Sequence, residues 1–89
     1  MGPVAERIRR KLVDAFAPER LDVDDESARH QGHAGAREGG ESHFSVTVVS
    51  SAFSGIGRVE RQRRVYAALS EELAGPVHAL SLRALAPGE

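Results

Sequence analysis

The chain opens with the pattern of an amphipathic helix. Apolar side chains recur at every fourth position, the spacing that places them on one helical face. They are Val4, Ile8, Leu12 and Phe16. Pro3 suits the first turn of a helix, where an N–H would have no partner, and Pro18 cannot continue one because its ring fixes φ and removes the donor. The pattern therefore predicts a helix over Pro3–Phe16.

Two segments with alternating apolar and polar residues predict the first two strands. Leu21–Asp24 has the alternation of a short, half-buried strand, and His43–Ser51 is the clearest strand of the chain. The apolar side of the second strand consists of Phe44, Val46 and Val48. Between the strands lies a polar, glycine-rich stretch, Asp25–Ser42. A loop of this length in a small domain is usually functional or disordered.

A second helix and a third strand complete the pattern. A turn at Ser54–Gly57 precedes a helix predicted over Arg58–Ala74, which ends at Gly75 and Pro76. Its apolar face is expected to contain Val59, Tyr66, Leu69 and Leu73. The third strand is predicted over Val77–Leu85, with His78, Leu80 and Leu82 on one side. Residues 86–89 are expected to form a flexible tail.

The order of these elements, helix-strand-strand-helix-strand, predicts one α/β (α+β) domain over residues 1–89. A helix between the second and third strands permits a right-handed crossover connection. The economical architecture is a three-stranded mixed sheet with the helices packed on one face.

The composition narrows the possible functions. A net charge of −1 provides no overall attraction to nucleic acid or to an anionic membrane. No apolar run approaches the length of a membrane span. The chain has no cysteine, so it has neither disulfides nor thiolate ligands of its own. We therefore expect a cytoplasmic protein of bacterial type that does not bind membranes.

The chain has no recognisable catalytic motif, and we expect it not to be an enzyme. It lacks a GxSxG nucleophile elbow and a Walker-type phosphate loop. Asp24, Asp25 and Glu26 are consecutive, and consecutive residues of an extended chain point to opposite sides, which is a poor arrangement for an acid–base pair. These features favour a protein that works by binding a partner.

Four histidines are candidate metal ligands, because neutral imidazole binds zinc, copper and iron. His30 and His33 are three positions apart in the glycine-rich loop, so their rings can converge on one metal ion. Solvated loop histidines are common, however, and the spacing alone favours that alternative. From pattern alone, His78 is expected to be a partly buried histidine bonded to a backbone carbonyl, and His43 to have a structural role.

Four arginines cluster at the start of the second predicted helix: Arg58, Arg61, Arg63 and Arg64. Three of them, Arg58, Arg61 and Arg64, follow one flank of the helix. Such a stripe suits contacts to phosphates or to an acidic partner protein. The alternative is a solvated helix edge whose arginines pair with neighbouring glutamates.

Four segments, in order, resemble the BolA family over about Val4 to Leu85. Residues 25–30 (DESARH) are similar to the family's DES-x-x-H turn, and residues 41–50 (ESHFSVTVVS) to its ESHF strand. Residues 53–69 (FSGIGRVERQRRVYAAL) are similar to its F-x-G…RHR-x-VY-x-x-L helix, and residues 77–82 (VHALSL) to its VHAL strand. Each segment alone is a weak signal, but the combination at these spacings is specific.

The resemblance implies a fold similar to class II KH domains and a role in iron–sulfur trafficking. BolA-like proteins pair with monothiol glutaredoxins and share a [2Fe–2S] cluster, for which the glutaredoxin and bound glutathione supply thiolates. On this chain the resemblance implies His78 as the fixed ligand and His30 as the second, with His33 as its substitute. A chain without cysteine cannot hold such a cluster alone, so a partner is required. Alone, we expect a monomer or a weak homodimer.

The resemblance also implies an alternative function as a DNA-binding regulator of stress response and morphology. The arginines of the second helix would then form the contact surface, although the neutral overall charge argues against tight binding.

One residue departs from the family pattern. Gln62 replaces the histidine of the RHR segment, and helical spacing predicts it on the inward edge of the helix, between Val59 and Tyr66. Glutamine is a poor metal ligand, so a role of that histidine in relatives does not transfer to this chain.

Overall fold

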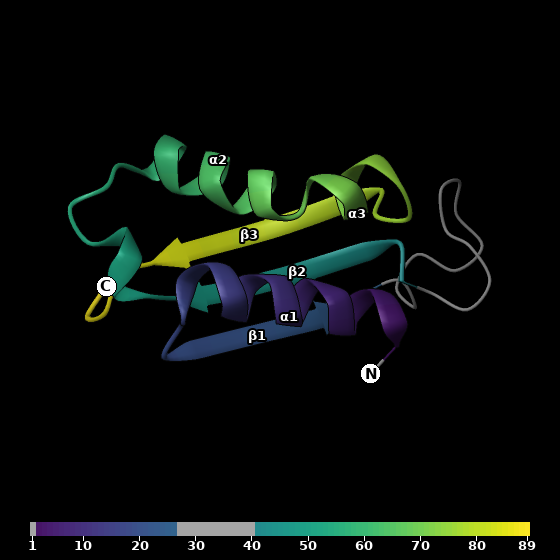
Figure 1. Ribbon diagram of the computed structural model, residues 1–89, viewed down its shortest axis with the longest axis horizontal. Helices are drawn as coiled ribbons and strands as arrows, with labels where there is room; N and C mark the ends of the chain where they lie inside the picture. The colour runs from purple at the N-terminus through teal and green to yellow at the C-terminus, as the bar shows by residue number, and fades with distance from the viewer. Residues whose placement is uncertain (1, 27–40) are drawn as a thin grey trace.

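The computed structural model describes residues 2–26 and 41–89, which form three strands with helices over one face (Figure 1). The elements are α1 (Pro3–Phe16), β1 (Arg20–Asp25), β2 (His43–Val49), the short 3-10 helix η2 (Ser51–Phe53), α2 (Arg58–Ala68), α3 (Ser70–Ala74) and β3 (Ala79–Leu85). The strand order is β1-β2-β3, with β1 antiparallel and β3 parallel to β2. The predicted mixed α+β sheet is confirmed.

The core lies between the helices and the inner face of β2. Phe44, Val46 and Val48 are almost fully buried, as their alternation predicted. They are covered by Ile8 and Leu12 of α1, by Val65 of α2 and by Leu69, which follows α2, and all of these belong to the same buried cluster. Burial of one such side chain is worth roughly 1.5–3 kcal/mol, so this single apolar layer is what holds the helices on the sheet.

Helix α1 has the bounds that the sequence predicts, and its end is well defined. Ala17 adopts a left-handed conformation (φ 44°), and its N–H donates to the carbonyl of Val13 at 2.9 Å. Pro18 follows immediately. The hydroxyl of Ser50 donates to the carbonyl of Phe16 at 2.7 Å, which ties the end of the helix to the end of β2.

The helix predicted over Arg58–Ala74 is instead two helices, α2 and α3. Leu69 interrupts them with non-helical angles, φ −105° and ψ 19°. The prediction that Val59 belongs to the buried face is wrong, since it is 63% exposed. Val59 precedes the buried Val65 by six positions, which places the two side chains roughly 120° apart around a helix of 3.6 residues per turn. Among the described residues, no helix is long and apolar enough to cross a bilayer.

Glu72 of α3 is a fully buried acid that joins this helix to α1. Its carboxylate lies 2.8 Å from the Arg7 guanidinium and 2.9 Å from the Lys11 ammonium. Burial by itself would raise the pKa of Glu72, but the hydrogen bonds from Lys11, the backbone and Arg7 outweigh it and hold the pKa below its ordinary value. A buried charge of this kind is tolerated because it is paired.

The C-terminal residues, expected to form a tail, make specific contacts in the structure. Ala86 is buried, and its N–H donates to the Glu89 carboxylate at 3.0 Å. The same carboxylate accepts from the Arg61 guanidinium, with Nη2 and Oε2 2.9 Å apart. Arg61 thereby fastens the end of the chain to the start of α2.

Candidate functional site

Three strand termini meet at one end of the sheet, the right-hand end in Figure 1. Because β1 is antiparallel to β2, its last residue Asp25 pairs with Phe44, near the start of β2. Because β3 is parallel to β2, it starts at the same end, with Ala79 opposite His43. We call Asp25, Glu41, Ser42, His43 and His78 the histidine end of the sheet.

The backbone of His78 is held by Ser42. The buried Ser42 accepts two hydrogen bonds on its carbonyl, from the N–H of His78 at 2.8 Å and from that of Ala79 at 3.2 Å. The third strand therefore starts at Ala79, two residues later than predicted, and His78 lies just before it. His78 is exposed, which contradicts the partly buried histidine expected from pattern alone.

The rings of His43 and His78 are neighbours. Their centroids are 6.3 Å apart, and the ring planes differ by 21°. His43 is half-buried, and its Nδ1 lies 2.9 Å from the Ser42 hydroxyl. His43 thus lies between the buried Ser42 and the exposed ring of His78. The sequence analysis did not predict this pairing. The signal for it is that His43 begins β2, that His78 directly precedes β3, and that these two strands are parallel neighbours.

Glu41 links the histidine end to the first helix. It has a positive φ of 62°, and its N–H donates to the Asp25 carboxylate at 3.0 Å. Its own carboxylate accepts the N–H groups of Val4 and Ala5, at 2.9 and 3.0 Å. These are orphan donors of the first turn of α1, which has no side-chain cap from its own N-cap residue. Glutamate 41 therefore caps a helix that begins far away in the sequence.

The histidine end cannot hold a metal ion without further ligands. Within residues 2–26 and 41–89, no group of three histidine, cysteine or acidic side chains is arranged to bind one. His78 offers an accessible imidazole and His43 a second, less accessible one. His30 and His33, the other ligands expected from the sequence, lie outside the described residues.

The four arginines of α2 do not form one continuous stripe. Arg61 donates from Nε to the carbonyl of Ile56 at 2.7 Å and from Nη1 to that of Ala84 at 3.1 Å. Its hydrogen bonds with Glu89 raise the pKa of Arg61 and lower that of Glu89 to about 2. Arg64 pairs with Glu60 at 3.2 Å. In the described ranges, Arg58 and Arg63 are the two members of the group without an ion pair.

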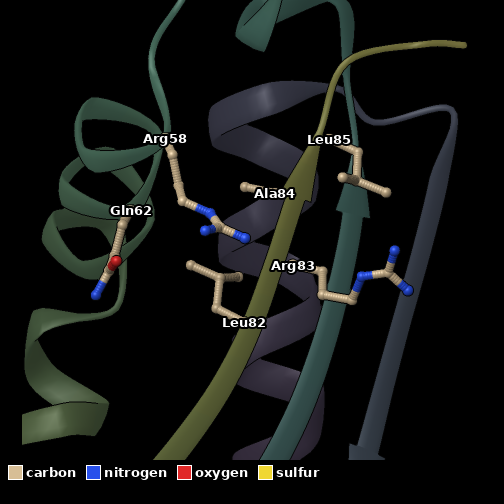
Figure 2. Close-up of a pocket in the computed structure, with 6 residues that line it drawn as sticks. All are labelled: Arg58, Gln62, Leu82, Arg83, Ala84 and Leu85. Carbon is tan, nitrogen blue, oxygen red and sulfur yellow. The ribbon is translucent and has the colours of Figure 1, made fainter. Parts of the chain in front are cut away.

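Gln62 of α2 lies beside the C-terminal half of β3, whereas His78 lies just before the first residue of that strand. With Arg58, Gln62 lines a groove of about 170 Å³ between α2 and the C-terminal half of β3 (Figure 2). The strand side of the groove consists of Leu82, Arg83, Ala84 and Leu85. The inward-edge position expected for Gln62 corresponds to this groove, and the residue itself is exposed. Gln62 therefore does not belong to the histidine end.

Known protein sequences match over the whole chain. BolA-like protein 1 of Bos taurus is 52% identical over 89 residues, which are 100% of this chain and 63% of that protein. The DNA-binding transcriptional regulator BolA of Escherichia coli (strain K12) is 48% identical over 79 residues, 89% of this chain and 71% of that protein. This chain spans less than two thirds of the length of its mammalian relatives, 61–63%.

Solved structures agree with the sequence matches. The BolA domain of SufE1 from Arabidopsis thaliana superimposes with a TM-score of 0.86 at 41% identity, covering 98% of this chain and 95% of that one. BolA1 from the same plant gives 0.87 at 38% identity, covering 100% and 98%. The family model for BolA-like protein matches residues 12–89. By its sequence motifs, its sheet and these matches, the chain belongs to the BolA family.

Proposed function

We propose that this chain is a non-enzymatic, cytoplasmic partner in iron–sulfur trafficking. It binds a monothiol glutaredoxin and co-ligates a shared [2Fe–2S] cluster through histidine. His78 is the fixed ligand, His30 is the second ligand, and His33 can replace His30. The glutaredoxin and its bound glutathione supply the thiolates that this cysteine-free chain lacks.

The observation that carries the proposal is an exposed imidazole on a fixed backbone. A ligand that joins a cluster held by another protein has to be accessible from outside, as His78 is. It also binds more tightly when little conformational freedom is lost on binding. The carbonyl of Ser42 holds the backbone of His78, and the ring of His43 lies beside its imidazole.

Histidine ligation would change the properties of the shared cluster. Replacing a thiolate by a neutral imidazole on one iron raises the reduction potential and lowers the negative charge of the cluster. A cluster shared in this way differs chemically from one held by the glutaredoxin and glutathione alone. That difference suits a protein that receives or passes on a cluster.

A spectroscopic titration tests the proposal. The protein is added to a glutathione-loaded monothiol glutaredoxin that carries a [2Fe–2S] cluster, and visible absorption and circular dichroism are recorded. We expect a new spectrum that saturates at a one-to-one ratio and that is lost with His78→Ala. Gln62→Ala, at the other end of β3, is the matched control and should give the wild-type spectrum. An unchanged spectrum, with no complex by size-exclusion chromatography, would refute the proposal.

The second candidate function is DNA binding, as in the name of the Escherichia coli relative. Within the described residues, Arg58 and Arg63 of α2 and Arg83 of β3 lack an ion pair. Each phosphate contact contributes about −0.9 to the slope of log K against log salt concentration. Three contacts therefore predict a slope of about −2.7. A flat slope with both promoter and random duplexes would exclude this candidate.

A further inference from the structure

The outer edge of β3 has unpaired backbone groups. The N–H of Ala79 donates to Ser42 and the carbonyl of Leu85 accepts from Ser50, so odd-numbered residues of β3 face β2. The N–H and C=O groups of Leu80, Leu82 and Ala84 therefore point outward. In the part of the chain that the structure describes, one of these groups has a partner: the carbonyl of Ala84 accepts from Arg61.

The groove described above runs along the C-terminal half of this edge. Arg58 reaches from α2 toward Ala84, whereas Arg83 extends from the opposite side of β3 across β2 (Figure 2). Neither guanidinium has an ion pair within residues 2–26 and 41–89. Arg58 thus places a positive charge beside the free edge on the inner face of the sheet, whereas Arg83 belongs to the edge strand itself and carries its guanidinium on the outer face, over β2.

We propose that this edge binds an extended acidic segment of a partner protein, which adds to the sheet as a strand beside β3. Main-chain hydrogen bonds to both outward groups of Leu82 and to the N–H of Ala84 would supply affinity, the common mode of recognition at an exposed sheet edge. Side chains of the added strand alternate between the two faces of the sheet. Of two consecutive acidic residues, one would therefore reach Arg58 on the inner face, and the other would lie opposite Arg83 on the outer face, whose guanidinium would turn from β2 toward it.

The groove favours a peptide over a single-stranded nucleic acid. Proteins bind single strands by stacking bases on aromatic side chains, and the six residues that line this groove include no aromatic one. Its apolar wall, Leu82 with Ala84, suits an aliphatic side chain of an added strand.

The proposed edge is separate from the histidine end. His78 precedes the first residue of β3, whereas Arg58 lies beside the last residues of the seven-residue strand. At roughly 3.3 Å per residue, the strand separates the two by about 20 Å. A segment bound at this edge and a cluster bound at His78 can be present together.

Binding of a labelled peptide tests the proposal. The probe is a fluorescein-labelled peptide of about six residues, with two central glutamates flanked by valines and threonines. Its binding is measured by fluorescence anisotropy. We expect binding accompanied by amide shifts of Leu82 and Ala84 in nitrogen-15 NMR spectra. Arg58→Glu and Arg83→Glu should each weaken binding by about tenfold. His78→Ala should bind the peptide like wild type even if the proposed cluster function fails.

Three controls separate strand addition from simple charge attraction. Arg64→Glu makes the same charge change on α2 outside the groove and should alter binding by less than about twofold. A peptide with lysines in place of the glutamates should not bind. The acidic peptide methylated at alternate backbone nitrogens should lose binding, because it cannot form the hydrogen bonds of a strand. The proposal would be overturned if the methylated peptide bound as well as the unmethylated one, or if Arg64→Glu weakened binding as much as Arg58→Glu. It would also be overturned if a single-stranded oligonucleotide, but not the peptide, shifted the amides of Leu82 and Ala84.

Discussion

The imidazole rings of His43 and His78 lie almost parallel, 6.3 Å apart, although the two residues belong to different strand starts. The parallel register of β2 and β3 brings them together, because it places Ala79 beside His43. The exposed ring of His78 therefore has the half-buried ring of His43 as its neighbour. If His78 is the ligand, as proposed, this arrangement gives His43 the role of its neighbour in the site.

The two roles predict different spectra. His78→Ala should abolish the spectrum of the shared cluster, whereas His43→Ala should shift its bands and weaken the complex without abolishing it. Because His78 is exposed, His78→Ala should change the free energy of unfolding by less than about 0.5 kcal/mol. Visible circular dichroism and chemical unfolding measure both effects. Complete loss of the cluster in His43→Ala with a native fold would make His43 a ligand rather than a neighbour of one.

The second ligand can be tested in the segment between the first two strands. His30→Ala and His33→Ala should each retain the spectrum of the shared cluster, since the proposal allows one histidine to replace the other. The double variant should weaken the cluster, seen as faster loss of visible absorption on dilution or on addition of a chelator. Retention of the wild-type spectrum and lifetime in the double variant would remove both histidines from the ligand set.

The buried Glu72 should make stability depend on pH. Glu72→Gln should lower the free energy of unfolding by about 1.5–3 kcal/mol at neutral pH, because it replaces hydrogen bonds to charged groups. The pKa of Glu72 is lowered in the folded state, so its contribution is present above its unfolded pKa of about 4.3. That contribution is lost as the pH falls through the lower folded value.

Urea unfolding of wild type and Glu72→Gln from about pH 7 to pH 3 measures this dependence. The difference between the two proteins should shrink at the acidic end. Glu71→Gln is the matched control, because Glu71 also pairs with Lys11 but has a side chain that is 78% exposed. It should cost less than about 1 kcal/mol. A difference that grows in acid would contradict the assigned direction of the pKa.

The cap on α1 predicts that two distant substitutions have the same effect. Glu41→Ala should destabilise the fold by about 1 kcal/mol, a usual value for a lost helix cap. Gly2→Ala should have a similar effect, because a Cβ at this position would collide with the Glu41 carboxylate and displace it. Thermal unfolding followed by circular dichroism measures both. The exposed Glu19 provides the control Glu19→Ala, and additive effects in the Gly2–Glu41 double variant would argue against a shared cause.

Arg61 and Glu89 predict an unusual titration at the C-terminus. The hydrogen bonds from Arg61 and from the backbone of Ala86 lower the pKa of Glu89 to about 2. The contact should therefore persist in acid and be lost only as the pH falls toward that value. Carbon-13 NMR of the Glu89 carboxyl group measures the midpoint directly. In Arg61→Gln the midpoint should move up toward about 4.3; a midpoint unaffected by this substitution would disprove the contact in solution.

The sequence was most informative where local periodicity and burial agree. Helix α1 has an apolar stripe bounded by two prolines, and its predicted and observed limits coincide. The alternation of Phe44, Val46 and Val48 likewise identified the buried side of β2. In both cases the residues that form the predictive pattern lie within a single helix or strand.

Predictions failed where a residue depends on partners far away in the chain. Val59 was assigned to the buried face for its apolarity, but the orientation of α2 is set by Val65 and Leu69. The burial of Glu72, for which the sequence pattern gave no prediction, likewise depends on its ion pairs with Arg7 and Lys11 of another helix. At the histidine end, motifs identified His78, whereas its pairing with His43 and the capping role of Glu41 follow only from the register of the sheet.

The carboxylate of Glu41 has a consequence for how events at the histidine end can be observed. Glu41 lies two residues before His43, at the start of β2, and its carboxylate accepts hydrogen bonds from the first turn of α1. Coupling between two such places is reciprocal, so a ligand that orders one also stabilises the other. Amide hydrogen exchange at Val4 and Ala5 should therefore slow when the histidine end is occupied. The first turn of the chain would then report on occupancy without taking part in binding.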